Sequence, residues 1–142
     1  MSDANKAIVR RFYDQVWNQA NYWTADDLVA PEYVRHAPQP IKGRDGIRHV
    51  VEGVRAAFPD LYISIEDLIA DGDRVAVRWH AYGTHNGDFR GISPTGRPVQ
   101  IVGITLSRFH NAQIVEEWSQ WDILGLLQQI GEGQEVGKAS VH

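Results

Sequence analysis

The sequence predicts a single α+β domain in which a curved antiparallel sheet wraps over N-terminal helices around a pocket. Three observations lead to this fold class. Up to residue 58, apolar residues recur every three or four positions, which is typical of helices. From residue 61 to residue 122 they alternate with polar residues, which is typical of strands. Helices first and strands afterwards indicate that the helices cover one face of the sheet.

Three helices are expected before the sheet. Residues 3–17 form an amphipathic helix, and residues 24–29 form a short one with Thr24 as its cap. A brief extended piece follows at residues 32–36, and the third helix spans residues 47–58, where Pro59 ends it. These helices supply the apolar layer that the sheet must cover.

Four strands are expected at residues 61–69, 75–82, 99–110 and 113–122. Asp71-Gly72-Asp73 joins the first pair as a tight hairpin, and Asn111-Ala112 joins the last pair. The Gly- and Pro-rich residues 83–98 make a long excursion that we read as a rim or lid at the mouth of the pocket. Residues 123–130 form a closing helix, so the domain spans residues 1–130 and residues 131–142 form a flexible tail.

The composition excludes several classes of function. A chain of 142 residues with 43% hydrophobic and 23% charged residues is an ordinary globular domain. The net charge is −4 and the basic residues are scattered, so we expect no nucleic-acid or membrane partner. Cysteine is absent, which excludes disulfides and thiolate chemistry. No signal peptide and no apolar run of about 20 residues is present, so a cytoplasmic location is expected.

The stretch QIVEEWSQWD, residues 113–122, is the best candidate for chemistry. In an extended strand, alternate residues share a face, which groups Trp118, Gln120 and Asp122. An acid among indole rings is poorly hydrated, and this would raise the pKa of Asp122 toward the range useful for proton transfer. The local sequence alone favours a structural role, because Asp122 can cap the helix that begins at Ile123. The residues on the opposite face are Glu117, Ser119 and Trp121.

Four segments resemble the SnoaL-like polyketide cyclases of the nuclear-transport-factor-2-like superfamily. They are YVRHAPQPIKGRDGI (residues 33–47), GTHNGDFRGISPTGRPV (83–99), RFHNAQIVEEW (108–118) and WDILGLLQQIG (121–131). The resemblance covers most of the chain and implies the cone-shaped fold of that superfamily. It departs from the family's usual Asp-Gly turn before the last strand, where this chain has Asn111-Ala112.

The resemblance also implies a function. Members of the family close the last ring of an aromatic polyketide by intramolecular aldol condensation, without a metal or another cofactor. Asp122 matches the acid/base of the family, and His36 matches a histidine in its pocket. Such a site needs one well-placed acid/base and an apolar slot that folds a small aromatic substrate. The residues expected to contact the substrate are Trp118, Trp79, His80, Gln120 and Arg78.

Two other functions stay open. An epoxide hydrolase of similar fold uses an Asp-Arg-Asp set, of which Arg78 and Asp122 could supply two members. His80 stands where the second acid would be needed, which argues against this function. The other alternative is a non-catalytic module that binds a small apolar ligand or dimerises, with Asp122 acting only as a cap.

The remaining polar candidates are less specific. His80 fits a pocket or a solvated or inter-subunit face. Arg90 and Arg97 fit either a contact with a substrate carboxylate or ester, or solvated charge. No HxH or HxxxH spacing supports a metal site. A curved sheet leaves an apolar face exposed, so a homodimer or homotetramer is expected.

Overall fold

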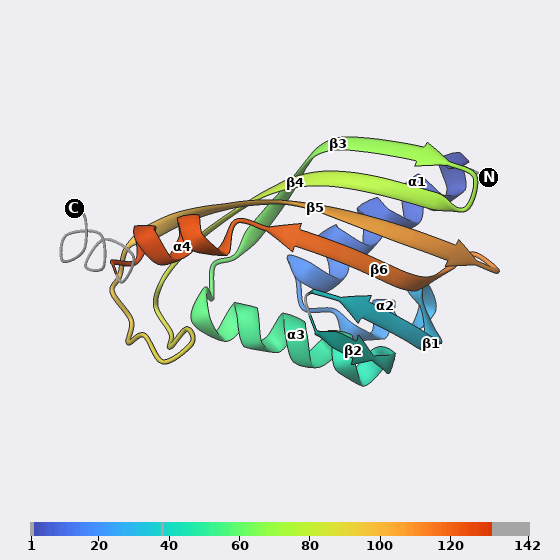
Figure 1. Ribbon diagram of the computed structural model, residues 1–142. Coiled ribbons are helices and arrows are strands. Elements are labelled where there is room, and N and C mark those ends of the chain that lie inside the picture. Colours follow the sequence, from blue (N-terminus) through green and yellow to red (C-terminus); the bar gives the residue numbers. More distant parts are fainter. Residues whose placement is uncertain (1, 38, 132–142) are drawn as a thin grey trace.

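The computed structural model describes residues 2–37 and 39–131, and it confirms the predicted α+β architecture of a curved sheet over helices (Figure 1). The predicted flexible tail lies outside the described residues from residue 132 onward. No helix in the described part of the chain is long and apolar enough to cross a membrane.

The N-terminal helix has two parts. The α-helix α1, Ser2–Arg11, continues without a break into a π-helix, η1, Phe12–Trp17. The backbone N–H of Asn18 donates to the carbonyl of Tyr13 at 3.0 Å, the five-residue spacing that defines a π-helix. The sequence predicted the extent of this helix but not the change of pitch.

Helix α2, Tyr22–Leu28, begins two residues earlier than the sequence predicted. Asn21 is its cap, because the Asn21 side chain accepts a hydrogen bond from the backbone N–H of Thr24 at 3.4 Å. Thr24 was therefore the wrong cap, and it is buried inside the first turn instead. Asn and Thr both cap helices well, so residue type alone did not distinguish Asn21 from Thr24 as the cap.

The six-stranded sheet has the order β2-β1-β6-β5-β4-β3. Its strands are β1 Val29–His36, β2 Pro40–Lys42, β3 Tyr62–Asp71, β4 Arg74–Thr84, β5 Pro98–His110 and β6 Gln113–Trp121. Helix α3, Gly43–Ala57, connects β2 to the region before β3. Strands β3 to β6 form the predicted antiparallel meander, whereas β1 pairs with β6 in parallel. Neither β2 nor this parallel pairing was predicted from the sequence.

The sheet bends around the helices. Its register shifts in β1 between Val29 and Val34, in β3 between Ile65 and Asp67, and in the β5–β6 pair next to Arg108 and Phe109. Such bulges increase local twist and curve a sheet. The inner, concave face packs against α1, η1 and α3, and its core includes fully buried Phe12 and Ile114 (Figure 1).

The last hairpin and the closing helix match their predictions. Asn111 and Ala112 both have positive φ, 51° and 60°, as a two-residue hairpin turn requires. Helix α4, Ile123–Gln129, follows β6 directly, and Asp122 is its N-cap.

Residues 85–97 form the predicted long loop, which is fastened to the C-terminal end of α3. The backbone N–H groups of Asn86 and Gly87 both donate to the carbonyl of Ala57, at 3.1 and 3.0 Å. A Cβ atom on Gly87 would overlap the carbonyl oxygen of Ala56. The absence of a side chain at Gly87 is therefore what allows the loop to approach the helix.

This contact predicts opposite effects for two Gly→Ala substitutions. Gly87→Ala must push the loop away from α3, so we expect the free energy of unfolding to fall by about 1–3 kcal/mol. Gly53→Ala, in the middle of α3, meets no atom within 4 Å, so the better helix propensity of alanine should raise it by about 0.5–1 kcal/mol. Urea unfolding measures both, and equal effects of the two substitutions would contradict the close approach at Gly87.

Candidate functional site

A cavity of about 220 Å³ lies between the concave face of the sheet, η1, α3 and the loop at residues 85–97. Its walls are mainly apolar and rich in aromatic rings, as ligand pockets for flat molecules are. The aromatic residues that line it are Tyr13, Trp17, Phe58, Trp79, Phe89 and Trp121. Helix α3 adds Val50 and Val54 to one wall, and β5 adds Ile101 to another.

The π-helix determines which side chains of the N-terminal helix reach the cavity. A π-helix has more residues per turn than an α-helix, so residues four apart point in more nearly the same direction. Tyr13 and Trp17 are four apart in η1, and both line the cavity. Phe12 and Val16 point into the apolar core beside them.

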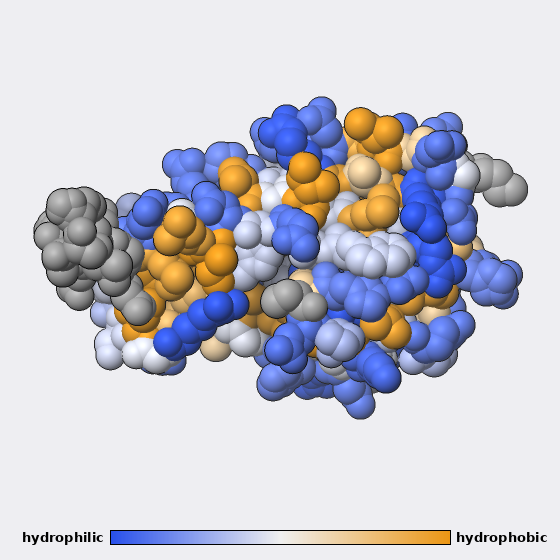
Figure 2. Space-filling model, in the orientation of Figure 1, coloured by the Kyte–Doolittle hydropathy of each residue, from blue (hydrophilic) through white to orange (hydrophobic). Residues whose placement is uncertain are grey.

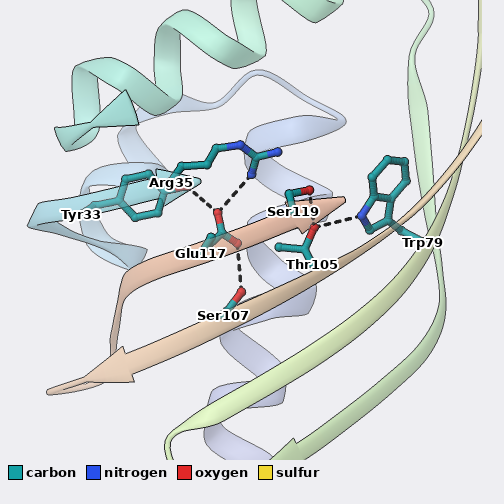
Figure 3. A network of polar contacts seen from close by, with 7 residues as sticks. All are labelled: Tyr33, Arg35, Trp79, Thr105, Ser107, Glu117 and Ser119. Carbon is teal, nitrogen blue, oxygen red and sulfur yellow. Dashed lines mark hydrogen bonds and ion pairs between the residues drawn. The ribbon is translucent and has the colours of Figure 1, made fainter. Parts of the chain in front are cut away.

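Behind the cavity, a buried carboxylate joins three strands (Figure 3). Glu117 of β6 is fully buried and accepts hydrogen bonds from the Tyr33 hydroxyl at 2.5 Å and the Ser107 hydroxyl at 2.9 Å. Nη1 of Arg35 lies 3.4 Å from the same carboxylate. A buried charge is tolerated only when it is paired and hydrogen-bonded, and here both conditions are met.

Arg35 connects this buried ion pair to the cavity, because its side chain also lines the cavity wall. Burial, the largest single cause, lowers the pKa of Arg35, but the charge of Glu117 together with Tyr33 and Tyr13 outweighs it. The pKa is raised as a result, so the guanidinium stays charged. Burial, with the charge of Glu117 in addition, raises the pKa of Tyr33 well above its ordinary value, which keeps Tyr33 a hydrogen-bond donor. The guanidinium carbon of Arg35 lies 5.7 Å from the centre of the Trp17 ring.

A second polar group on the cavity wall is the phenol of Tyr13. Burial, and then the charge of Glu117, raise the pKa of Tyr13 above its usual range, although a hydrogen bond with Thr105 opposes the shift. Thr105 also accepts from Nε1 of Trp79 at 3.1 Å and shares a hydrogen bond with Ser119 at 2.9 Å (Figure 3). Tyr13 is thus a neutral phenol held near a fixed cation, Arg35.

The loop at residues 85–97 closes one side of the cavity with Phe89 and Arg90. His85 holds the loop together from inside, where it is fully buried. Its Nδ1 accepts from the backbone N–H of Thr95 at 3.2 Å and lies 3.0 Å from the Thr95 hydroxyl. His85 therefore fixes the shape of the loop from within.

Asp122 does not lie where the sequence placed it. Its side chain is exposed and accepts a hydrogen bond from the backbone N–H of Gly125 at 2.8 Å, the helix-cap arrangement. Its neighbour Trp121 lines the cavity instead. The expectation of an acid enclosed by indole rings was wrong because the opposite face of β6, with Glu117, Ser119 and Trp121, is the one that faces inward.

His36 and Trp118 lie together on the outer face of the sheet rather than in the cavity. Their rings stack with centroids 5.6 Å apart, and His36 Nε2 lies 2.8 Å from a carboxylate oxygen of Glu116. Arg108 binds the other oxygen of Glu116 at 3.1 Å. The hydrogen bond from His36, with that from Arg108, lowers the pKa of Glu116. The two predicted residues therefore belong to a surface network.

The other predicted contacts are also divided between the two faces. Trp79 lines the cavity, whereas His80 stacks on Tyr82 with ring centroids 4.4 Å apart and Gln120 is exposed on the outer face. Arg78 donates to Asp67 at 2.6 Å on the same exposed surface. Arg78 and Asp122 thus do not form the paired set that an epoxide hydrolase would need.

One pattern in the sequence does indicate the buried residues that were not predicted, Tyr33, Arg35 and Glu117. In β1, Tyr33 and Arg35 alternate with Val34 and His36, and an Arg on the same face as a buried Tyr indicates an inward charge. Glu117 is its match on the neighbouring strand, since Arg35 and Glu117 are register partners. Within residues 2–37 and 39–131, no three His, Asp or Glu side chains gather as they would to hold a metal ion.

Comparisons with known proteins agree with this architecture. The chain matches the family model of SnoaL-like polyketide cyclases over residues 7–130. It is 32% identical to IdmH, a candidate polyketide cyclase from Streptomyces antibioticus, with 89% of this chain and 98% of that chain covered and a TM-score of 0.81. A search of curated proteins gave no match.

Two further solved structures are similar. A candidate polyketide cyclase from Acidithiobacillus ferrooxidans is 31% identical, with 92% of this chain and 96% of that chain covered and a TM-score of 0.82. AclR, a candidate hydroxylase from Streptomyces galilaeus, is 27% identical, with 93% and 98% covered and a TM-score of 0.84. With the family match spanning residues 7–130 and this fold, the chain belongs to the SnoaL-like polyketide cyclase family.

Proposed function

We propose that the protein is a cyclase that closes a ring in a small, conjugated, polyketide-like substrate by an intramolecular aldol-type reaction. One observation carries this proposal: an aromatic, apolar cavity holds a buried guanidinium, Arg35, and a neutral phenol, Tyr13, on its wall. The family match and the names of two similar structures support a cyclase-type reaction. Because one fold hosts many chemistries, the residues of the cavity must supply the mechanism.

The first requirement of the reaction is a folded substrate. Flat rings of Trp17, Trp79 and Trp121 form the walls of the cavity and favour a planar, conjugated ligand. An enclosed apolar slot limits the conformations of a flexible chain and brings its two reacting carbons together. Such positioning can supply several kcal/mol of the barrier reduction, about 7–11 at most.

The second requirement is a stabilised enolate. A methylene group between two carbonyls is acidic already, so it can lose its proton to water. The negative charge then rests on oxygen, and the guanidinium of Arg35 binds this oxygen. Glu117 and Tyr33 hold Arg35 in place beforehand, so little reorganisation is needed during the reaction.

The third requirement is a proton for the product. The enolate carbon attacks the second carbonyl carbon, a C–C bond forms, and the electron pair of that carbonyl moves to its oxygen as an alkoxide. Tyr13 donates its phenolic proton to this alkoxide, which is far more basic than a phenolate. The charge of Arg35 favours the phenolate of Tyr13 that remains, and water returns the proton afterwards.

This mechanism differs from the sequence prediction, in which Asp122 is the acid/base and His36 assists it. That prediction remains untested in function. The position of Asp122, exposed and bonded to a helix N-terminus, argues against it, whereas a substrate that extended to the start of α4 would favour it. The same experiment can test both assignments.

We also propose that the outer face of the sheet joins two copies of the chain. Val102 and Ile104 of β5 are 47% and 54% exposed there, and Leu124 of α4 is 60% exposed. Figure 2 shows apolar side chains among polar ones on this face, and a further apolar group over α4. The face carries side chains of both charges, such as those of the Arg78–Asp67 ion pair, so it can be self-complementary across a two-fold axis.

The assignment of Tyr13 predicts a difference between two conservative variants. Tyr13→Phe removes only the hydroxyl, so we expect kcat for ring closure to fall by about 10²-fold or more. Asp122→Asn keeps the cap of α4, because Asn caps as well as Asp, and should leave kcat within about twofold. The measurement is turnover of an anthraquinone-type polyketide, supplied as the ester and as the free acid, with thermal unfolding as the control for folding. Loss of turnover in Asp122→Asn alone would restore the sequence prediction.

The raised pKa of Tyr13 predicts how stability depends on pH. Its neutral form is favoured in the folded state, so its contribution is complete below the unfolded pKa of about 10 and is lost as the pH rises above it. Each such tyrosine should lower the free energy of unfolding by about 1.4 kcal/mol per pH unit.

Urea unfolding between pH 9 and pH 11 measures this slope. Tyr13→Phe should flatten it by about the contribution of one tyrosine, whereas Tyr62→Phe, at a residue 56% exposed, should leave it unchanged. Equal slopes in wild type and Tyr13→Phe would contradict the burial of a neutral phenol.

The proposed dimer predicts that a charge on the outer face separates the copies. Ile104→Asp places an unpaired carboxylate in the interface, and we expect mainly monomer at about 10 μM by sedimentation velocity. Trp23→Asp is the matched control, because Trp23 is 85% exposed on α2, away from this face. A wild-type protein that sediments as a monomer would reject the interface.

A further inference from the structure

The charges on the cavity wall are of one sign. The charged residues that line the cavity are Arg35 and Arg90, and its lining includes no Asp or Glu among the described residues. The charge of Arg35 is balanced by Glu117 from behind. Arg90 therefore contributes the net charge of the cavity, at its exposed side.

Arg90 has no carboxylate partner within 4.0 Å in the part of the chain that the structure describes. The nearest acid in sequence, Asp88, accepts a hydrogen bond from the backbone N–H of Gly91 at 3.2 Å. The guanidinium of Arg90 lies instead 5.5 Å from the centre of the Phe89 ring, and this ring is itself part of the cavity wall. A cation is thus held beside the apolar slot and is available to a ligand.

The backbone at Arg90 is unusual for an arginine. Phe89 and Ile92 pair through two backbone hydrogen bonds, of 3.0 and 2.8 Å, which leaves Arg90 and Gly91 as a two-residue turn. Both have positive φ, 51° and 83°, a conformation that favours Gly or Asn. A bulky residue in this region costs roughly 1 kcal/mol or more and is often retained for function.

From these observations we propose that Arg90 selects a substrate with a free carboxylate, so that the cavity takes an aromatic carboxylic acid in preference to its ester. The conjugated rings would occupy the slot, and the carboxylate would lie at the exposed side against Arg90. This inference rests on the proposed function only in that the cavity must bind the substrate.

The chemistry of the two groups explains the selectivity. A guanidinium offers parallel N–H donors that match the two oxygens of a carboxylate, and the pair is charge-assisted. An ester has neither the charge nor the second equivalent acceptor. The apolar wall beside Arg90 excludes water from one side of the pair, which strengthens it relative to a fully exposed ion pair.

The experiment compares 2-naphthoic acid with methyl 2-naphthoate at pH 7. Binding is followed by quenching of tryptophan fluorescence, since three tryptophans line the cavity, and by titration calorimetry. Wild type should bind the acid about tenfold more tightly than the ester. Arg90→Asn, which fits the left-handed turn without the charge, should remove this preference, whereas Arg90→Lys should keep part of it. Arg48→Gln is the control and should keep all of it, because Arg48 pairs with Glu52 on the surface of α3 and does not line the cavity.

The outcomes separate the inference from the proposed function. If the ester binds as well as the acid, or if Arg90→Asn weakens both ligands equally, Arg90 is structural and the inference is overturned, while the cavity proposal stands. If neither ligand binds, the cavity proposal itself fails. Rising salt should weaken only the acid, because only that complex depends on charge.

Discussion

The buried carboxylate of Glu117 is the constraint on which the rest of the site depends. It joins β6 to β1 through Tyr33 and Arg35, and to β5 through Ser107. Removing one partner of a buried ion pair typically costs about 3–5 kcal/mol, because the other charge is left unpaired. The three strands must therefore keep their register, and the parallel pairing of β1 with β6 follows from the same contacts. One electrostatic requirement thus determines both the local topology and the orientation of Arg35.

The same requirement determines which face of β6 points inward. Successive side chains alternate across a strand, so an inward Glu117 places Ser119 and Trp121 inside and Trp118 outside. A shift of one residue in the pairing of β6 would bury Trp118 and the other outward side chains, and it would expose Glu117. Asp122 follows the outer set and becomes the cap of α4. A catalytic role for a residue of this strand therefore depends on its parity before it depends on its chemistry.

Much of the fold could be predicted from the sequence because its signals are local. The period of the apolar residues in α1 and α3, and the turns at Gly72 and Asn111, each depend on a few neighbouring residues. The parallel β1–β6 pair depends on contacts between distant segments, which local periodicity does not report. The π-helix differs from an α-helix only in its backbone hydrogen-bond spacing, and the apolar period does not report that either. The polar residues of the site, Tyr13, Arg35 and Glu117, were not predicted for the same reason, because they come from separate elements. Trp79 was predicted as a contact because an indole ring can stack on a flat ligand.

In the proposed reaction, the arrangement of charge in the cavity would separate two tasks that one arginine could not perform. Arg35 is balanced by Glu117, so it can bind an enolate without holding a permanent anion so tightly that the product stays bound. Arg90 has no such counter-charge among the described residues, so it can retain an anion that does not change during the reaction. Binding energy at the exposed side would then position the reacting carbons beside Tyr13. The same fold occurs in candidate cyclases and a candidate hydroxylase, so we expect the charged side chains of the cavity, rather than the fold, to determine the substrate.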